Sequence, residues 1–249
     1  MRLALALIAS VCCFGRAEAT DVVASVNQAI LRSIEWQQRW YGEAFGADCV
    51  KRRAQEGATL TVQLFPPNDF AAYVKGTNVL YSGHRWPGKV VAQPSAGDIT
   101  TCGPGEIAPQ VKFEAAQGKI LRGPFAWQRL PAENEPPSRE KARQVEAMVI
   151  RSMAAYFASE GEPAPSSVRL ARYAANDPFL IVMDEQHNEL YTLDFPPIES
   201  LDDHTIVDVA DWGIFLGSDD QTERVSRARR HLIEEVRRNS RVLETHAGH

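Results

Sequence analysis

The sequence lacks the features that define several large functional classes. Its 27 Lys and Arg residues are outnumbered by 32 Asp and Glu residues, and this balance excludes a nucleic-acid-binding protein of the general basic kind. The acidic excess is also too small for an intrinsically disordered acidic chain. No His-Glu-x-x-His motif, Gly-x-Ser-x-Gly motif or phosphate-binding glycine loop occurs. The chain therefore carries no motif that identifies a catalytic class, and we expect neither a cofactor nor a metal site.

Long hydrophobic runs are missing apart from one near the N-terminus. After the basic start Met1-Arg2, residues 3–15 form an apolar run of about 13 residues, too short to span roughly 30 Å of hydrocarbon as a helix. The small-x-small sequence Ala17-Glu18-Ala19 follows and is typical of a signal-peptide cleavage site. We predict that residues 1–19 are a cleaved signal peptide. The mature chain is then expected to be soluble, without a membrane span, and periplasmic or secreted.

Cysteine is scarce once the signal peptide is removed. Cys12 and Cys13 belong to that peptide, which leaves Cys49 and Cys102. In an oxidising compartment two cysteines are most simply paired, and we predict a Cys49–Cys102 disulfide. The alternative is that Cys102 is a thiol nucleophile assisted by a histidine such as His84. That role requires a free thiolate, which a lone partner cysteine in an exported chain would capture.

Hydrophobic periodicity predicts three amphipathic helices, at 22–41, at 138–159 and from Ser218 onward, where Gln221 completes a capping box. Trp36 and Trp40 fall within the apolar arc of the first helix, so we expect core packing rather than a ligand-stacking platform. Turn residues and alternating patterns predict hairpin loops around 117–118 and 185–188 and a long loop at 93–109. Strands are predicted at 58–64, 78–81, 89–92, 111–115, 119–122, 125–130, 168–173, 178–183, 189–195, 205–209 and 212–216.

These elements predict an α+β fold, with a mainly antiparallel sheet, or two, packed by three amphipathic helices. We expect residues 20–249 to form a single domain. A junction between sub-domains, if the chain has one, is expected in the Pro- and Glu-rich connector at 131–137.

Charge is distributed unevenly along the chain. No Lys or Arg occurs from Tyr173 to Glu223, a stretch that contains 13 carboxylates, whereas residues 224–241 contain seven arginines and two acids. Either the arginines neutralise the acidic strands within the fold, or an acidic surface stays open to a partner. Helical spacing places Arg229 within the apolar arc of the last helix, so it is expected to face the body and to need a carboxylate partner. The other arginines are expected to face solvent.

We therefore expect a binding protein that presents an acidic surface to a basic protein partner, as a periplasmic inhibitor or an immunity protein would. The alternative is a cell-envelope hydrolase that uses a histidine with an acidic cluster, with or without a metal ion. A turn at Ser82–Pro87 would expose His84, which has no evident partner in the sequence. His204 and Asp208 are expected to share a strand face, but they are too far apart along it to bind one ion. The candidate partner-binding residues are Asp184, Glu185, His187, Asp202, Asp203, His204, Asp208 and Asp211.

The predicted disulfide can be tested on protein recovered from the exported fraction. Non-reducing peptide mapping should find Cys49 and Cys102 in one cross-linked peptide. In the chain-entropy account, closing a loop of about 54 residues stabilises the fold by about 4 kcal/mol. The Cys49→Ser and Cys102→Ser variants should therefore unfold at similar, markedly lower denaturant concentrations. Recovery of both cysteines as free thiols would contradict the pairing.

Overall fold

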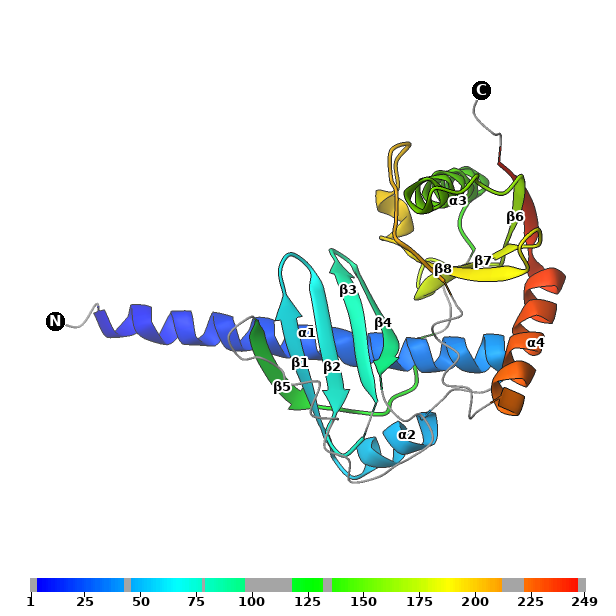
Figure 1. Cartoon of the computed structure of the whole chain (residues 1–249). Helices are drawn as coiled ribbons and strands as arrows, with labels where there is room; N and C mark the ends of the chain where they lie inside the picture. Colours follow the sequence, from blue (N-terminus) through cyan, green and yellow to red (C-terminus); the bar gives the residue numbers. More distant parts are fainter. Residues whose placement is uncertain are drawn as a thin grey trace. The chain divides into compact units, whose positions relative to one another are not determined.

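The computed structural model describes residues 4–42, 46–77, 79–96, 118–131, 136–211 and 222–245 (Figure 1), without the side chains of 4–19, 95–96, 211, 222 and 224–225. Across these ranges the chain forms four α-helices and two five-stranded antiparallel sheets, which confirms the α+β class. Among the same residues, no helix has both the length and the apolar character needed to cross a membrane.

The chain divides into two compact units. The first comprises Met1–Ile34, Phe45–Arg85 and Val90–Leu130, and the second comprises Glu35–Ala44, Trp86–Lys89 and Pro131–His249. The last segment of the second unit thus begins within the connector predicted at 131–137. Whether residues 20–249 act as one domain stays a prediction.

The first unit contains a sheet with the strand order β4-β3-β2-β1-β5. Figure 1 shows these strands side by side, and β1 pairs antiparallel with both β2 and β5. Helix α1 contributes its first part to this unit, and the short helix α2 also belongs to it. The bounds are Ala4–Tyr41 (α1), Ala47–Gln55 (α2), Thr59–Phe65 (β1), Asp69–Val74 (β2), Leu80–Trp86 (β3), Lys89–Ala96 (β4) and Lys119–Pro124 (β5).

Helix α1 packs closely against the first sheet. An added Cβ on Gly123 of β5 would lie 2.9 Å from Val23 Cγ1, so the absence of a side chain at Gly123 permits this approach. Asn27, also on α1 and buried, holds the segment that follows β5. Its amide nitrogen donates to the Ala126 carbonyl at 3.0 Å, and its carbonyl oxygen accepts from the Ala126 N–H at 2.8 Å.

Several predictions for the first unit need correction. Strand β1 matches the expected strand at 58–64, but Thr61 and Gln63 are buried along with their apolar neighbours, so the strand is covered on both faces. Strand β2 and helix α2 were not predicted, because their short sequences show little periodicity. Residues 125–130 form no strand, and the expected strand at 111–115 and turn residue Gln117 lie outside the described residues.

Ser82–Trp86 lie within β3 and do not form the predicted turn. Gly83 is needed there because a strand neighbour packs over it: an added Cβ would come within 2.7 Å of Phe70 Cζ.

The second unit contains a sheet with the order β10-β6-β7-β8-β9, in which all paired neighbours are antiparallel. Helix α3 packs on one face. The apolar side of α4 contacts β6 and β7, and Trp36 of α1 contacts β7 through Phe179, with ring centroids 4.2 Å apart. The bounds are Arg139–Glu160 (α3), Ser167–Leu170 (β6), Phe179–Asp184 (β7), Glu189–Asp194 (β8), Val209–Asp211 (β9), Thr222–Asn239 (α4) and Arg241–Glu244 (β10), with a 3-10 turn η1 at Ile198–Ser200.

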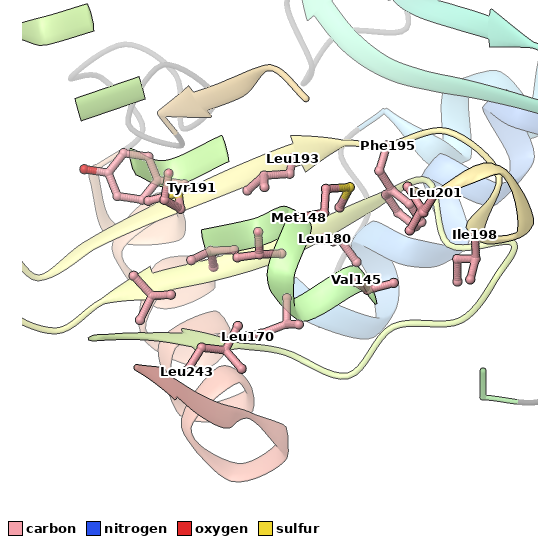
Figure 2. Packing of buried hydrophobic residues seen from close by; sticks show 14 of the residues in the cluster. Val145, Met148, Leu170, Leu180, Tyr191, Leu193, Phe195, Ile198, Leu201 and Leu243 are labelled. Atoms are coloured by element: carbon pink, nitrogen blue, oxygen red, sulfur yellow. The ribbon is translucent and has the colours of Figure 1, made fainter. Parts of the chain in front are cut away.

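The core beneath α3 is formed by apolar side chains from the helix and from four strands. Figure 2 shows Met148 and Val145 of α3 beside Leu180 of β7 and Leu193 of β8. All six residues of β7 are buried, because alternate side chains face α3 and the opposite layer. Ser138 begins α3 as predicted, and its hydroxyl accepts the Lys141 N–H at 3.4 Å.

The predictions for the second unit are largely confirmed, and the exceptions lie near the C-terminus. The β7–β8 hairpin is present, but residues 205–208 are irregular and β9 begins only at Val209. Arg241, expected in the last turn of the final helix, begins the unpredicted strand β10. Ser218, Gln221 and the expected strand at 212–216 lie outside the described residues.

Trp36 and Trp40 belong to the core, as predicted. They are 2% and 4% exposed, and their ring centroids lie 6.4 Å apart. Neither ring face is presented to solvent as a stacking platform.

Replacing Met148 tests the core under α3. Met148 is fully buried, so Met148→Ala should lower the free energy of unfolding by about 2–5 kcal/mol, through lost burial and the cavity left behind. Glu160→Ala, on the exposed end of the same helix, should change it by less than about 0.5 kcal/mol. Chemical denaturation of both variants measures the difference, and equal effects would contradict the assignment of Met148 to the core.

Candidate functional site

Asp184, expected on an exposed acidic surface, is instead fully buried at the end of β7. Its carboxylate accepts N–H groups from the hairpin loop that follows: Oδ1 lies 2.9 Å from the Gln186 nitrogen and 3.3 Å from the His187 nitrogen. Oδ2 lies 2.5 Å from Nδ1 of the His187 ring. The carboxylate is drawn inward because it satisfies the polar groups of a tight turn.

His187 is held from two directions. Its ring stacks on Phe157 of α3, with centroids 6.0 Å apart and planes inclined by 28°. The hydrogen bond that the His187 ring donates to Asp184, then the charge of Asp184, and more weakly the charges of Glu189 and Glu162, raise the pKa of His187 above its ordinary value. The same hairpin carries a second polar pair, in which the Tyr191 hydroxyl donates to the Glu189 carboxylate.

Glu185 is compensated within the fold. Its carboxylate pairs with Arg169 of β6 at 3.0 Å and with Arg237 of α4 at 3.6 Å. For this residue the arginine-rich helix neutralises an acid, so the expectation of an unmatched carboxylate is wrong here.

The remaining arginines of residues 224–241 that have described partners follow a mixed pattern. Arg229 is exposed and donates to the Asn188 carbonyl at 3.4 Å, so the expectation that it faces the body beside a carboxylate is wrong. Arg238 pairs with Glu235 on its own helix, and Arg241 pairs with Glu146 of α3 at 2.9 Å. These pairs direct arginines of α4 and β10 to acids other than those of residues 202–208.

Residues 202–208 form an exposed acidic segment between η1 and β9, which we call the acidic loop. Asp202, Asp203, His204 and Asp208 are all exposed. Among the described residues, no Lys or Arg forms an ion pair with any of these three carboxylates. The acidic loop therefore keeps the open negative charge that the sequence pattern predicts for this region.

Hydrogen bonds within the acidic loop fix its shape. Asp202 Oδ1 accepts the His204 N–H at 2.9 Å and the Thr205 hydroxyl at 2.8 Å. The Thr205 hydroxyl oxygen in turn accepts the Asp202 N–H at 3.0 Å. The hydroxyl of Thr205 and the N–H of His204 lower the pKa of Asp202, so its carboxylate stays ionised at neutral pH.

Helix α3 holds the acidic loop through main-chain groups. The Arg151 guanidinium donates to the carbonyl oxygens of Asp202 at 3.0 Å and of Thr205 at 3.2 Å. One residue further along the helix, the Ser152 hydroxyl accepts the Val207 N–H at 3.0 Å. Because these bonds use the loop backbone, the outward side chains remain available for contacts.

Sequence reasoning overlooked an apolar member of this surface. Ile206 lies within the acidic loop and is 59% exposed. The sequence pattern predicts a strand at 205–209 and does not single out Ile206 as an exposed apolar residue. His204 and Asp208 do not share a strand face either, because the strand begins only at Val209. Asp211 lies on β9, and its side chain is outside the described part of the chain.

The histidines give limited support to the hydrolase alternative. His84 lies on β3 and does have a partner, because its Nδ1 is 2.7 Å from Asp69 Oδ1 on β2. Both side chains are partly exposed. In the described part of the chain, no group of three or more His, Cys, Asp or Glu residues could hold a metal ion. Cys49 is buried at 7% exposure, and Cys102 lies outside the described residues, so their pairing stays a prediction.

Compared with known protein families, with curated proteins and with solved structures, the chain shows no significant match. Functional inference therefore rests on the residues and geometry described above.

The Asp184–His187 pair makes a testable prediction about pH. In the variant Asp184→Asn, the pKa of His187 should fall towards its ordinary value of 6.5, because the hydrogen bond and charge that raise it are lost. In the unaltered chain the stabilisation from protonated His187 is fully present below about pH 6.5 and is lost as the pH rises through the raised pKa. Titration of the His187 ring by NMR measures the shift.

Glu185→Gln is the matched control for that titration. It removes the same charge from the adjacent position without touching His187. A fall in the His187 pKa of equal size in both variants would contradict the assignment to Asp184.

Proposed function

We propose that this protein is an exported binding protein whose acidic loop, residues 202–208, docks a basic protein partner. The observation that carries the proposal is the set of three exposed carboxylates, Asp202, Asp203 and Asp208, which have no cationic partner among the described residues. Two other acids of the same sequence region, Asp184 and Glu185, are buried or paired. The acidic loop carries three exposed carboxylates on one short segment, and Glu199 is a further exposed acid just before it.

The hydrogen bonds that hold the backbone of the acidic loop support a role in binding a partner. Binding a partner costs conformational entropy when a flexible loop must become ordered. The bonds from Arg151 and Ser152 to the loop backbone already restrict it. A basic partner would meet carboxylates in a fixed arrangement, which favours specificity as well as electrostatic steering of the encounter.

Ile206 supplies an exposed apolar side chain beside the carboxylates. Interfaces combine a buried apolar centre with a polar rim, and an exposed isoleucine flanked by acidic residues has that composition. Full burial of such a side chain contributes about 1.5–3 kcal/mol. We therefore assign Ile206 as the apolar contact and the three carboxylates as the charged rim.

The predicted export of this chain and its net negative charge suggest which kind of partner it binds. A chain exported through the signal peptide at 1–19, with a net acidic mature part, suits a periplasmic inhibitor or an immunity protein that neutralises a cationic enzyme or toxin. The hydrolase alternative has two oriented pairs, Asp184–His187 and Asp69–His84. Among the described residues, no hydroxyl or thiol group forms a hydrogen bond with His187.

The experiment is affinity capture from an envelope fraction at low salt, followed by elution with a salt gradient. The eluted protein is purified and its affinity is measured at several salt concentrations. Replacing Asp202, Asp203 and Asp208 together by Asn should weaken binding by about 3-fold to 150-fold at low salt, given about 0.2–1 kcal/mol for each exposed pair. The same variant should also flatten the salt dependence.

Two further variants separate charge from apolar contact. Glu160, Glu234 and Glu244 are exposed acids outside the acidic loop, and replacing all three by Gln changes the net charge equally but should leave affinity nearly unchanged. Ile206→Ser should weaken binding without changing the salt dependence. Salt-independent capture, or equal losses in the two charge variants, would overturn the proposal.

A further inference from the structure

Helix α4 presents a row of arginines to solvent. Its apolar side is buried, with Ala228, Leu232 and Val236 at most 2% exposed. On the opposite side, four exposed arginines fall within an arc of about 100° at helical spacing. They are Arg227, Arg230, Arg237 and Arg238, and we call them the arginine face.

The fold leaves much of this positive charge unmatched. Within the described part of the chain, no carboxylate forms an ion pair with Arg227 or Arg230. Arg237 and Arg238 do have partners, at Glu185 and Glu235, but their own side chains are 54% and 65% exposed. Exposed ion pairs contribute little to stability, so these two arginines can also bind a carboxylate of another molecule.

Two acids lie on the same side of α4 and reduce its charge without cancelling it. Glu223 and Glu234 are both exposed, and helical spacing places them within the arc of the arginine face. Four arginines and two glutamates leave this side of the helix with an excess of positive charge.

The acidic loop offers the complementary surface on the same chain. Its three exposed carboxylates have no Lys or Arg partner among the described residues, and Ile206 beside them is 59% exposed. An arginine can place the apolar stem of its side chain on such a residue while its guanidinium binds a carboxylate. The acidic loop and the arginine face therefore match in charge and in the kind of contact that each provides.

One copy of the chain does not bring the two surfaces together. The acidic loop is bonded to Arg151 and Ser152 of α3, which packs on the face of the sheet that carries Leu180 and Val182. Helix α4 contacts β6 and β7 from the other face. Because the sheet lies between them, the loop and the arginine face can meet only when they belong to different molecules.

We propose that the arginine face of one copy docks on the acidic loop of a second copy. The inference rests on the proposed role of the acidic loop in docking a basic protein, and it adds that free copies cover one another's loops until a tighter partner displaces them. The contact joins two different surfaces, so each copy keeps one of them free. Association of this kind continues into chains and does not stop at a symmetric pair.

Sedimentation velocity of the purified exported protein, without any partner, tests the inference. At about 20 mM NaCl the average mass should rise with protein concentration up to about 1 mM and should exceed that of two chains, because exposed ion pairs are individually weak but unscreened. At about 300 mM NaCl it should return to the mass of one chain, because salt screens those pairs.

Two variants separate the surfaces. The loop variant replaces Asp202, Asp203 and Asp208 by Asn, and the face variant combines Arg227→Glu with Arg230→Glu. Each alone should self-associate at least about fourfold more weakly at low salt. An equimolar mixture should restore association but stop at two chains, because the intact arginine face of the loop variant meets the intact loop of the face variant.

The matched control combines Arg139→Glu with Arg143→Glu, at exposed positions on α3 outside both surfaces, and should associate as the unaltered chain does. Glu234→Gln removes a repelling carboxylate from the arginine face and should strengthen association by about twofold to fivefold.

Four outcomes would overturn the inference. They are a single-chain mass at every concentration in low salt, equal losses in the face variant and its control, association that persists in both single variants, and a mixture that stays at one chain. The second includes an arginine face that binds anionic lipid vesicles only. The third is expected if the exposed Val242 on the edge strand β10 mediates pairing instead. The face variant keeps its acidic loop and should still bind the envelope partner, so loss of self-association and loss of partner binding are separate results.

Discussion

The second unit is organised around one strand that is buried on both faces. Every residue of β7 is buried, with α3 on one side and α4 and the end of α1 on the other. A strand that is buried on two faces needs a packed layer on each side, so β7 determines where its neighbours lie. The acidic loop is held by α3. A cavity lies where the loop leading into β7 meets the end of α1 and the end of α4.

The acids between Tyr173 and Glu223, where the sequence has no Lys or Arg, fall into three kinds of environment in the structure. Asp184 is buried and holds a turn, Glu185 is paired with two arginines, and the carboxylates of the acidic loop stay open. A count of charges along the chain could not separate these cases, because each depends on which groups the fold brings within hydrogen-bonding distance. The sequence predicts the region in which open negative charge occurs. Tertiary contacts determine which of its carboxylates stay exposed and without an ion pair.

The parts of the fold that the sequence predicted are those with long, regular periodicity. Helix α3 and the β7–β8 hairpin have enough repeating apolar positions to show their period, so their ends were placed within a few residues. The end of α1 at Tyr41 was placed correctly, but this helix begins at Ala4 and not at residue 22 as predicted. Helix α2 and strand β10 are too short for such a signal. The segment 205–208 alternates like a strand, yet it is irregular, because its main-chain groups bond to Arg151 and Ser152 instead of a neighbouring strand. The cavity had no sequence signature at all, since its lining comes from three separate segments.

Helix α3 holds the acidic loop through main-chain groups, and this affects which of its exposed residues can be substituted during evolution. Arg151 and Ser152 bond to the main-chain carbonyl groups of residues 202 and 205 and to the N–H of residue 207, so most side chains at 203, 204, 206 and 208 could be exchanged without loosening that attachment. Only Asp202 and Thr205 use their side chains to shape the backbone. During evolution, substitutions at these positions could therefore change the charge and size of the exposed side chains to match a changing partner, while the backbone of the loop kept its conformation.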